Sequence, residues 1–209
     1  MSATNVNEQK PTVFIVDDEC AVRDALGLLI ESAGLSAEGF DSACAFLEAY
    51  DPDRPGCLLL DVRMKHMSGL DLQEALRKKR VAIPIIFITG HGDVAISAQA
   101  FRGGAIDFIE KPFDAKTILS RIDEALEKDA QSREKHAAID QILRRYERLT
   151  PREKEVMKLV IGSRSNKKIA KILGISHRTV DVHRAHVMEK MDADSLADLI
   201  AMALEAEIA

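Results

Sequence analysis

The segment Val13-Phe-Ile-Val-Asp-Asp18 is an apolar run that ends in two carboxylates. Three later segments repeat this pattern of an apolar run followed by a polar side chain, namely Leu58-Leu-Leu-Asp61, Ile85-Ile-Phe-Ile-Thr89 and Phe108-Ile-Glu-Lys111. Continuous apolar runs are typical of parallel strands that are covered on both faces. Because the carboxyl ends of parallel strands share one edge of the sheet, where ligands bind, we expect three acids, a hydroxyl and an ammonium to converge there.

These runs belong to a regular alternation of strand and helix patterns in the first half of the chain. The strand patterns lie at about 12–16, 36–40, 57–60, 84–88 and 106–109. The helical patterns lie near 20–33, 42–49, 69–79, 93–102 and 115–128. Five successive β-α units predict an α/β fold, with a doubly wound five-stranded parallel sheet and helices on both faces.

The side chains at the predicted edge suit phosphoryl transfer. The pair Asp17 and Asp18 can hold Mg2+, which binds one or two carboxylates together with waters and phosphate oxygens. Asp61 can act as a nucleophile, because carboxylates are known phosphoryl acceptors. The hydroxyl of Thr89 can donate a hydrogen bond to a phosphoryl oxygen, and the ammonium of Lys111 can neutralise its charge.

In this order the segments resemble the receiver domain of bacterial two-component response regulators, over about 11–128. The resemblance implies a flavodoxin-like receiver in which Asp61 accepts the phosphoryl group, while Thr89 and Lys111 contact it. It also implies a Mg2+ site made of the side chains of Asp17, Asp18 and Asp61 and the backbone carbonyl of Arg63. Enzymatic activity is then limited to Mg-dependent self-phosphorylation from a phosphodonor and autodephosphorylation.

Three neighbouring features bear on how such a receiver works. Phe108 stands where receivers carry a switch aromatic, and ordinary packing in an edge strand is the alternative. The loop Thr89-Gly-His-Gly-Asp93 can bring backbone N–H groups near a phosphoryl group; for His91 we favour a solvent-facing position without a ligand. Lys65 stands where many receivers have proline, so this loop lacks one φ restraint.

Residues 129–148 are charged, contain neither Gly nor Pro, and predict a helical linker that continues the last receiver helix. Its apolar residues recur every three or four positions: Ile139, Ile142, Leu143, Tyr146 and Leu149. This narrow apolar face could pack on the chain's own second domain or on the linker of a partner, and we favour its own domain.

The remaining residues, 149–209, predict an all-α domain of four helices. Thr150-Pro-Arg-Glu153 combines a capping threonine, a proline at the first helical position and a capping-box glutamate. Helices are predicted at about 166–173 and 177–191, separated by Gly174-Ile-Ser176, and a fourth begins after Ser195. Two helices joined by a three-residue turn with glycine are typical of the helix-turn-helix.

The charge distribution differs between the two halves of the 209-residue chain. Residues 1–128 carry 14 basic and 21 acidic side chains, whereas 144–190 carry 13 basic and 5 acidic ones. A charge run is often only a solvated surface, but here it coincides with the helix pair, which favours nucleic-acid binding. The stretch 146–209 resembles the LuxR-type DNA-binding domain, and the whole chain resembles regulators of the FixJ/NarL type, most closely the FixJ branch.

On that resemblance the helix at 177–191 lies in the major groove of double-stranded promoter DNA. We expect four of its residues to face bases: Asp181, Val182, Arg184 and Ala185. We expect seven residues to face phosphates: Asn166, Lys167, Lys168, Arg178, Thr179, His183 and Lys190. Because Asp181 repels phosphate, it either accepts a hydrogen bond from a cytosine amino group or orients a neighbouring arginine.

The leading hypothesis is a cytoplasmic, phosphorylation-switched transcription factor. A sensor histidine kinase phosphorylates Asp61, two receivers pair through the fourth helix and fifth strand, and the dimer binds DNA and RNA polymerase. A phosphatase-like hydrolase is disfavoured because Arg63, not a second acid, stands two residues after Asp61. A phosphate-relay adaptor without DNA binding is disfavoured by the basic helix pair.

Other segments point to a protein without membrane contact. The chain has no apolar run near the ~18 residues of a spanning helix, and 1–10 lacks the basic and apolar regions of a signal peptide. Cys20, Cys44 and Cys57 are odd in number and far apart, which fits neither a disulfide framework nor a zinc site. We interpret them as small buried hydrophobic residues.

Overall fold

The computed structural model describes residues 10–90 and 94–208. The chain divides into two compact units between Ser132 and Arg133. The first unit has one hydrophobic core on each face of a sheet, and the second has a core of its own. Within the described ranges, no helix has the length and apolar character needed to cross a membrane.

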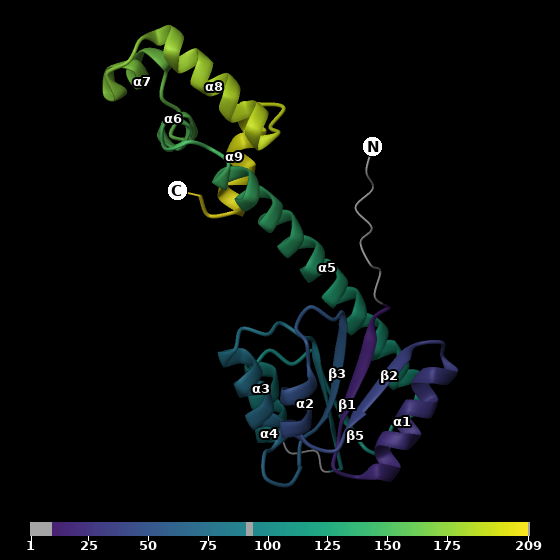
Figure 1. Cartoon of the computed structure of the whole chain (residues 1–209). Helices are drawn as coiled ribbons and strands as arrows, with labels where there is room; N and C mark the ends of the chain where they lie inside the picture. The colour runs from purple at the N-terminus through teal and green to yellow at the C-terminus, as the bar shows by residue number, and fades with distance from the viewer. Residues whose placement is uncertain (1–9, 91–93, 209) are drawn as a thin grey trace. The chain divides into compact units, whose positions relative to one another are not determined.

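The first unit is built on a fully parallel sheet (Figure 1). Its strands are β1 (Thr12–Val16), β2 (Ser36–Phe40), β3 (Gly56–Asp61), β4 (Ile85–Thr89) and β5 (Asp107–Glu110). They pair in the order β2-β1-β3-β4-β5. This order confirms the predicted doubly wound sheet and puts its switch point between β1 and β3, where ligands bind in such folds.

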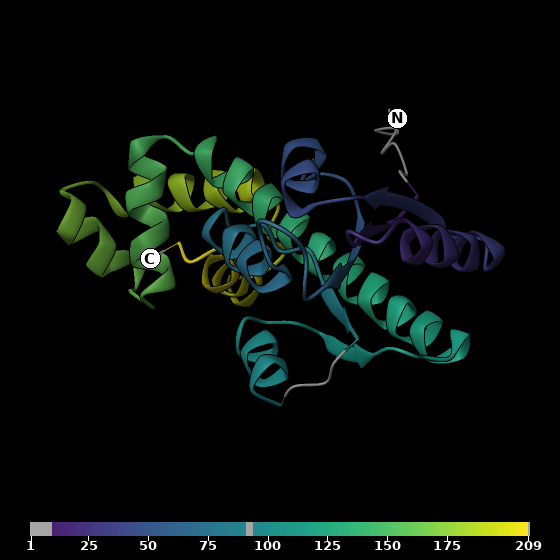
Figure 2. The same cartoon turned by 90° about the horizontal axis from the view of Figure 1, so that it is seen from below.

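Helices cover both faces of this sheet, as Figures 1 and 2 show. They are α1 (Cys20–Ser32), α2 (Ala43–Ala49), α3 (Gly69–Lys78), α4 (Val94–Arg102) and the start of α5 (Ala115–Glu147). Phe14 and Leu58 point to the core under α2, α3 and α4, whereas Val13 and Leu59 point to the core under α1 and α5. Strand side chains alternate between faces, so the apolar runs are continuous because both faces are buried.

Four helices follow the end of α5 in the described part of the second unit, which ends at residue 208. They are α6 (Pro151–Ile161), α7 (Asn166–Leu173), α8 (His177–Met191) and α9 (Leu196–Glu205). The predicted capping box is present, since the Thr150 side chain accepts from the Glu153 backbone N–H and the Glu153 carboxylate accepts from the Thr150 N–H. Gly174 has a left-handed φ of 65° where α7 ends, which allows the tight turn into α8.

The helix α5 runs without a break through the stretch predicted to be a linker. Of the apolar face predicted there, Ile142 and Leu149 are buried in the core of the second unit and Tyr146 packs against it. Leu143 is exposed and Ile139 lies outside this core. The apolar face of the linker therefore packs on its own domain, through three of its five predicted residues.

The prediction that all three cysteines are buried is wrong for two of them. Only Cys57, in the middle of the sheet, is buried, while Cys20 and Cys44 are exposed on helices. Burial raises the pKa of the Cys57 thiol to about 12. It therefore packs as a neutral side chain in the core.

Candidate phosphoryl-acceptor site and nucleic-acid interface

Two acids and a lysine meet at the carboxyl edge of the sheet. Asp17 follows β1, Asp61 ends β3 and Lys111 follows β5. The ammonium of Lys111 donates to Asp17 Oδ2 at 2.8 Å and to Asp61 Oδ1 at 3.0 Å. Asp17 and Asp61 are 2% and 8% exposed, so these are ion pairs in a largely desolvated site.

The second oxygen of each carboxylate is held by the backbone. Asp17 Oδ1 accepts from the Glu19 N–H at 2.9 Å, and Asp61 Oδ2 accepts from the Arg63 N–H at 2.7 Å. Both are local turns in which an aspartate bonds to the N–H two residues on. Each carboxylate is thus fixed by one backbone donor and by the shared ammonium, an arrangement that the sequence analysis did not anticipate.

Burial and charge act on this cluster in opposite directions. Burial raises the pKa of Asp61 above its ordinary 3.8, against the lowering effect of the Lys111 hydrogen bond. For Lys111, burial alone lowers the pKa, but hydrogen bonds to Asp17 and Asp61 outweigh it, so the pKa is raised. The ammonium of Lys111 is therefore held in its charged form, in which it can also bind an additional anionic group.

The predicted metal ligands are only partly brought together. Asp18 is half-buried, and across residues 10–90 and 94–208 no three His, Cys, Asp or Glu side chains lie close enough to hold a metal ion. The N–H of Arg63 bonds to Asp61, while the role of its carbonyl stays a prediction. The remaining donors still fit Mg2+, because this ion uses one or two carboxylates and takes its other oxygens from water and phosphate.

Thr89 lies beside this cluster at the end of β4. It is 2% exposed, and its carbonyl accepts from the Lys111 N–H at 2.7 Å. Phe108 in β5 is half-buried, with its ring centroid 6.2 Å from that of Phe87 in β4. This contact fits packing in the sheet, and a switch role for Phe108 stays a prediction. His91, Gly92 and Asp93 of the predicted phosphate loop lie outside the described residues.

Gly69 is a site residue that the sequence analysis missed. It begins α3, and a Cβ built there would stand 2.2 Å from the backbone carbonyl oxygen of Asp61. No side chain fits that space, so only glycine lets α3 start this close to the acceptor. The signal in the sequence is a lone glycine eight residues after Asp61, which does not reveal the contact.

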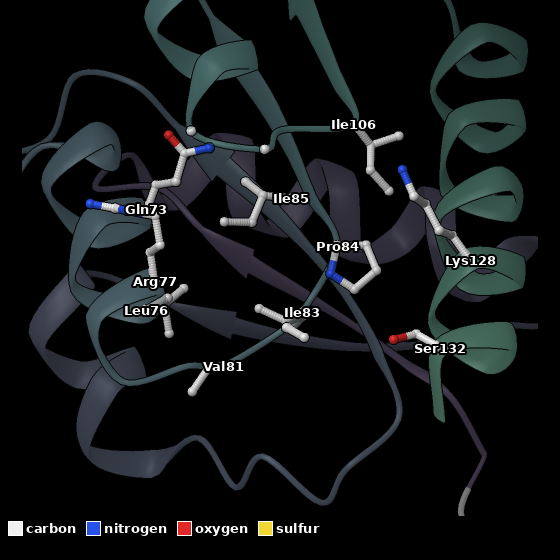
Figure 3. Close-up of a pocket in the computed structure, with 13 residues that line it drawn as sticks. Gln73, Leu76, Arg77, Val81, Ile83, Pro84, Ile85, Ile106, Lys128 and Ser132 are labelled. Carbon is white, nitrogen blue, oxygen red and sulfur yellow. The ribbon is translucent and has the colours of Figure 1, made fainter. Parts of the chain in front are cut away.

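One hollow of the first unit lies at the opposite edge of the sheet from the carboxylates. A cavity of about 260 Å³ opens where β4 and β5 begin, between α3 and α5. Figure 3 shows Lys128 and Ser132 on α5 and Gln73 on α3 around an apolar floor that includes Ile83 and Ile106. None of the predicted site residues lines it.

In the second unit, α7 and α8 form the predicted helix-turn-helix. Val180, Val187 and Met191 of α8 are buried, as predicted. The predicted DNA-contacting residues that are exposed are Lys167, Lys168, Arg178, Asp181, Val182 and Ala185. Those that are half-buried are Asn166, Thr179, His183, Arg184 and Lys190. The Nδ1 atom of His183 is buried and has no hydrogen-bond partner among the described residues.

One side chain of α7 connects two of the residues predicted to face bases. Asn166 Nδ2 donates to Asp181 Oδ1 at 2.5 Å, and Asn166 Oδ1 accepts from Arg184 Nη1 at 2.6 Å. The other oxygen of Asp181 lies 3.1 Å from His177 Nδ1. Asp181 is thus linked to Arg184 through Asn166, and both roles predicted for Asp181 stay predictions.

Lys190 is bound to the buried acid of the capping box. Its ammonium donates to Glu153 Oε2 at 2.6 Å, and Glu153 is 3% exposed. Burial by itself raises the pKa of Glu153, but hydrogen bonds from Lys190 and Thr150 outweigh this and lower the pKa to about 2. Two of the three N–H donors of Lys190 remain, so its phosphate contact stays a prediction beside this structural role.

We expect replacement of Glu153 by glutamine to destabilise the second unit by about 2 kcal/mol at pH 7, because a charge-assisted hydrogen bond contributes about 1.5–3 kcal/mol. A lowered pKa means that the stabilisation is complete above 4.5 and is lost as pH falls toward about 2. Amide hydrogen exchange of α6 and α8 at pH 7 and pH 3 measures this free energy.

Glu155→Gln is the matched control, since Glu155 lies on the same helix in an exposed pair with Arg152. This variant is expected to change stability by less than about 0.5 kcal/mol. Equal protection of α6 in wild type and Glu153→Gln at pH 7 would refute the role given to the buried pair.

Comparison with known proteins agrees with both halves of the chain. Residues 13–123 match the family model described as response regulator receiver domain. Residues 147–203 match the model described as bacterial regulatory proteins, luxR family. The two matches fall in the two compact units, apart from the linker region that both leave out.

Several relatives are similar over nearly their whole length. Nodulation protein W of Bradyrhizobium diazoefficiens is 45% identical, with 92% of this chain and 85% of the relative covered. The transcriptional regulatory protein FixJ of the same organism is 39% identical, over 94% of this chain and 96% of the relative.

Two solved structures cover nearly the whole chain. The structure of the response regulator StyR has a TM-score of 0.84 and 44% identity, and covers 94% of this chain and 99% of its own. The structure of full-length FixJ from B. japonicum has a TM-score of 0.58 and 38% identity, and covers 96% of this chain and 99% of its own.

Proposed function

Because the chain belongs to the two-component response regulators that join a receiver domain to a LuxR-type DNA-binding domain, we propose that a histidine kinase phosphorylates it on Asp61 and thereby switches its binding to promoter DNA. We assign the receiver to 11–128, the helical linker to 129–148 and the DNA-binding domain to 149–209. Membership of this family implies regulation of transcription, with a histidine kinase and DNA as partners.

The observation that carries this proposal is the ammonium of Lys111 between two buried carboxylates. Asp61 is the one of the two that ends a strand at the β1/β3 switch point and retains some exposure, so it can meet a phosphodonor. Lys111 would exchange its contact with Asp61 for one with the phosphoryl oxygens. Thr89, at the end of the adjacent strand, would donate its hydroxyl to another of these oxygens.

The proposed reaction transfers a phosphoryl group from nitrogen to oxygen. A carboxylate oxygen of Asp61 forms a P–O bond as the P–N bond of a phosphohistidine on the kinase breaks, and the imidazole nitrogen keeps the electron pair. Autodephosphorylation breaks the acyl phosphate with water. Asp17 and Asp61 would hold Mg2+, and Asp18 and the Arg63 carbonyl would have to turn toward the ion to join them. The ion would act as a Lewis acid and stabilise charge on the transferring oxygens.

We propose that phosphorylation makes the protein a homodimer through the face of α4 and β5. Exposed apolar side chains support this choice, because Val94 and Phe101 on α4 are 84% and 49% exposed. When Thr89 turns toward the phosphoryl group, Phe108 moves into the space it leaves and changes this face. A dimer with two-fold symmetry then fits palindromic half-sites.

For the DNA complex, we propose that α8 lies in the major groove of promoter DNA in the cytoplasm. We also propose that the bound protein contacts RNA polymerase. Asp181, Val182, Arg184 and Ala185 would face bases. The phosphate contacts would come mainly from the exposed side chains Lys167, Lys168 and Arg178 and from Thr179 and His183. Support comes from the basic surface of α7 and α8, since phosphate contacts position a protein while base contacts specify sequence.

We expect phosphorylation to raise the DNA affinity of the whole protein about 5- to 150-fold, the range of typical coupling free energies of 1–3 kcal/mol. The fragment 146–209 is expected to bind DNA at least as tightly as the unphosphorylated protein. Residues 1–128 have a net charge of −7 and residues 144–190 a net charge of +8. The fragment lacks the acidic receiver, whose negative charge repels DNA phosphates. Affinity is measured at one fixed salt concentration, since phosphate contacts make it steeply salt-dependent.

The control for this experiment is the Asp61→Asn variant treated with the same phosphodonor, which should keep the affinity of the untreated protein. Sedimentation of the same samples measures dimerisation. If phosphorylation changes neither DNA affinity nor dimerisation, the proposed switch is wrong and the receiver acts on another partner.

A further inference from the structure

Asn166 stands between two side chains of α8 that carry opposite charges. It is the first residue of α7, and it bonds to Asp181 and Arg184, which lie three residues apart on one face of α8. Only one orientation of the amide satisfies both contacts, because the carboxylate must accept and the guanidinium must donate. The amide nitrogen therefore faces Asp181 and the amide oxygen faces Arg184.

From this geometry we infer that Asn166 is a positioning residue, which presets Arg184 and Asp181 for recognition of bases and does not serve mainly as a phosphate contact. The inference rests on the proposed sequence-specific binding of DNA by α8. It changes the phosphate-contact role predicted for Asn166, because both polar atoms of its side chain are engaged within the protein and only one amide N–H remains for any other contact.

The network leaves the recognition atoms of both partners available. A guanidinium has five N–H donors, and one contact to Asn166 leaves enough for a bidentate bond to the O6 and N7 atoms of guanine. Asp181 has 53% of its side chain exposed and retains acceptor capacity for a cytosine amino group. His177 on the other oxygen of Asp181 restrains the carboxylate further.

If Asn166 holds Arg184 and Asp181 in place before DNA binds, the gain is in discrimination between sequences and not in general attraction to DNA. An arginine that is already held in its binding geometry loses less freedom on binding, which improves affinity by reducing the ordering cost. The neighbouring charge of Asp181 also offsets the attraction of Arg184 for any phosphate. We therefore expect Asn166 to affect the preferred sequence and to have little effect on other sequences.

The experiment uses the full chain and a randomised double-stranded DNA library, from which the wild type selects its preferred duplex. Affinity is then measured for this duplex and for a scrambled one over a series of salt concentrations. Asn166→Ala is expected to weaken affinity for the preferred duplex about tenfold and to change affinity for the scrambled duplex by less than about twofold. The dependence of log affinity on log salt concentration, the salt slope, should stay the same.

Lys167→Ala is the matched control, since Lys167 is the next residue on α7 and is exposed. Loss of a phosphate contact is expected to weaken binding to both duplexes alike and to reduce the salt slope by about one. In the background of Arg184→Ala, the additional replacement of Asn166 should have a smaller effect than in the wild type, because one of the two side chains that it positions is gone. Unchanged amide exchange of α7 and α8 shows that each variant is folded.

The outcomes separate this inference from the proposed function. If Asn166→Ala weakens both duplexes equally and lowers the salt slope, Asn166 is a phosphate contact and the inference is overturned while sequence-specific binding stands. If the losses of binding free energy caused by the Asn166 and Arg184 replacements add fully in the double variant, the two residues act independently, and the positioning role of Asn166 is also overturned. If the wild type selects no sequence, the proposed function fails and the inference fails with it.

Discussion

Replacement of Asp61 by asparagine is expected to abolish covalent labelling of the protein by acetyl phosphate. The change keeps the size of the side chain but removes the carboxylate that attacks phosphorus, so no acyl phosphate can form. The amide can still accept from the Arg63 N–H, which bonds to Asp61 at 2.7 Å, and the fold should be retained. Intact mass, with and without acetyl phosphate, measures the label.

Asp24→Asn is the control, because Asp24 is an exposed acid near the start of α1 and outside the carboxylate cluster. This variant should be labelled as fully as the wild type. Peptide mass spectrometry locates the label in both proteins. A label on an acid other than Asp61, retained in Asp61→Asn, would show that the acceptor has been assigned to the wrong residue.

Removal of divalent metal with excess EDTA is expected to slow labelling on the order of a hundredfold or more. Asp17 and Asp61 already share the single ammonium of Lys111, and an incoming phosphoryl group adds negative charge that one lysine does not balance. A bound metal ion contributes several kcal/mol to such a transition state, and each 1.36 kcal/mol is a factor of ten in rate.

Addition of Mg2+ in excess over EDTA should restore the rate, which controls for damage to the protein. Sodium chloride at the same ionic strength should not restore it, which separates a bound metal ion from general screening. Labelling at an undiminished rate in EDTA would show that the cluster of acids works without a divalent cation.

The strand ends of the receiver could be predicted because a parallel sheet leaves little freedom. If the runs at β1, β3 and β4 are parallel strands of one sheet, the residues after them must share an edge. The contact between Lys111 and Asp61, 50 residues apart, follows from this topology. The prediction that Asp18 joins Asp17 and Asp61 needed side-chain directions, and the described residues do not form that group.

Contacts between helices could not be predicted in the same way. The pattern of α8 correctly indicated Val180 and Val187 as buried, because helical periodicity fixes one face against the core. It did not indicate that Lys190 would reach Glu153 of α6 or that Asn166 of α7 would reach Arg184. Such pairs depend on how two helices cross, which local periodicity does not specify.

The contact between Gly69 and the backbone of Asp61 has a consequence for any map of tolerated substitutions. With a Cβ only 2.2 Å from that carbonyl oxygen, every other amino acid would displace either α3 or the acceptor strand. Gly69 can therefore be as restricted as the nucleophile although it holds no reactive atom. At such a site, intolerance to substitution reflects lack of space as well as loss of chemistry. Measuring phosphoryl labelling and folding for the same variant separates the two causes.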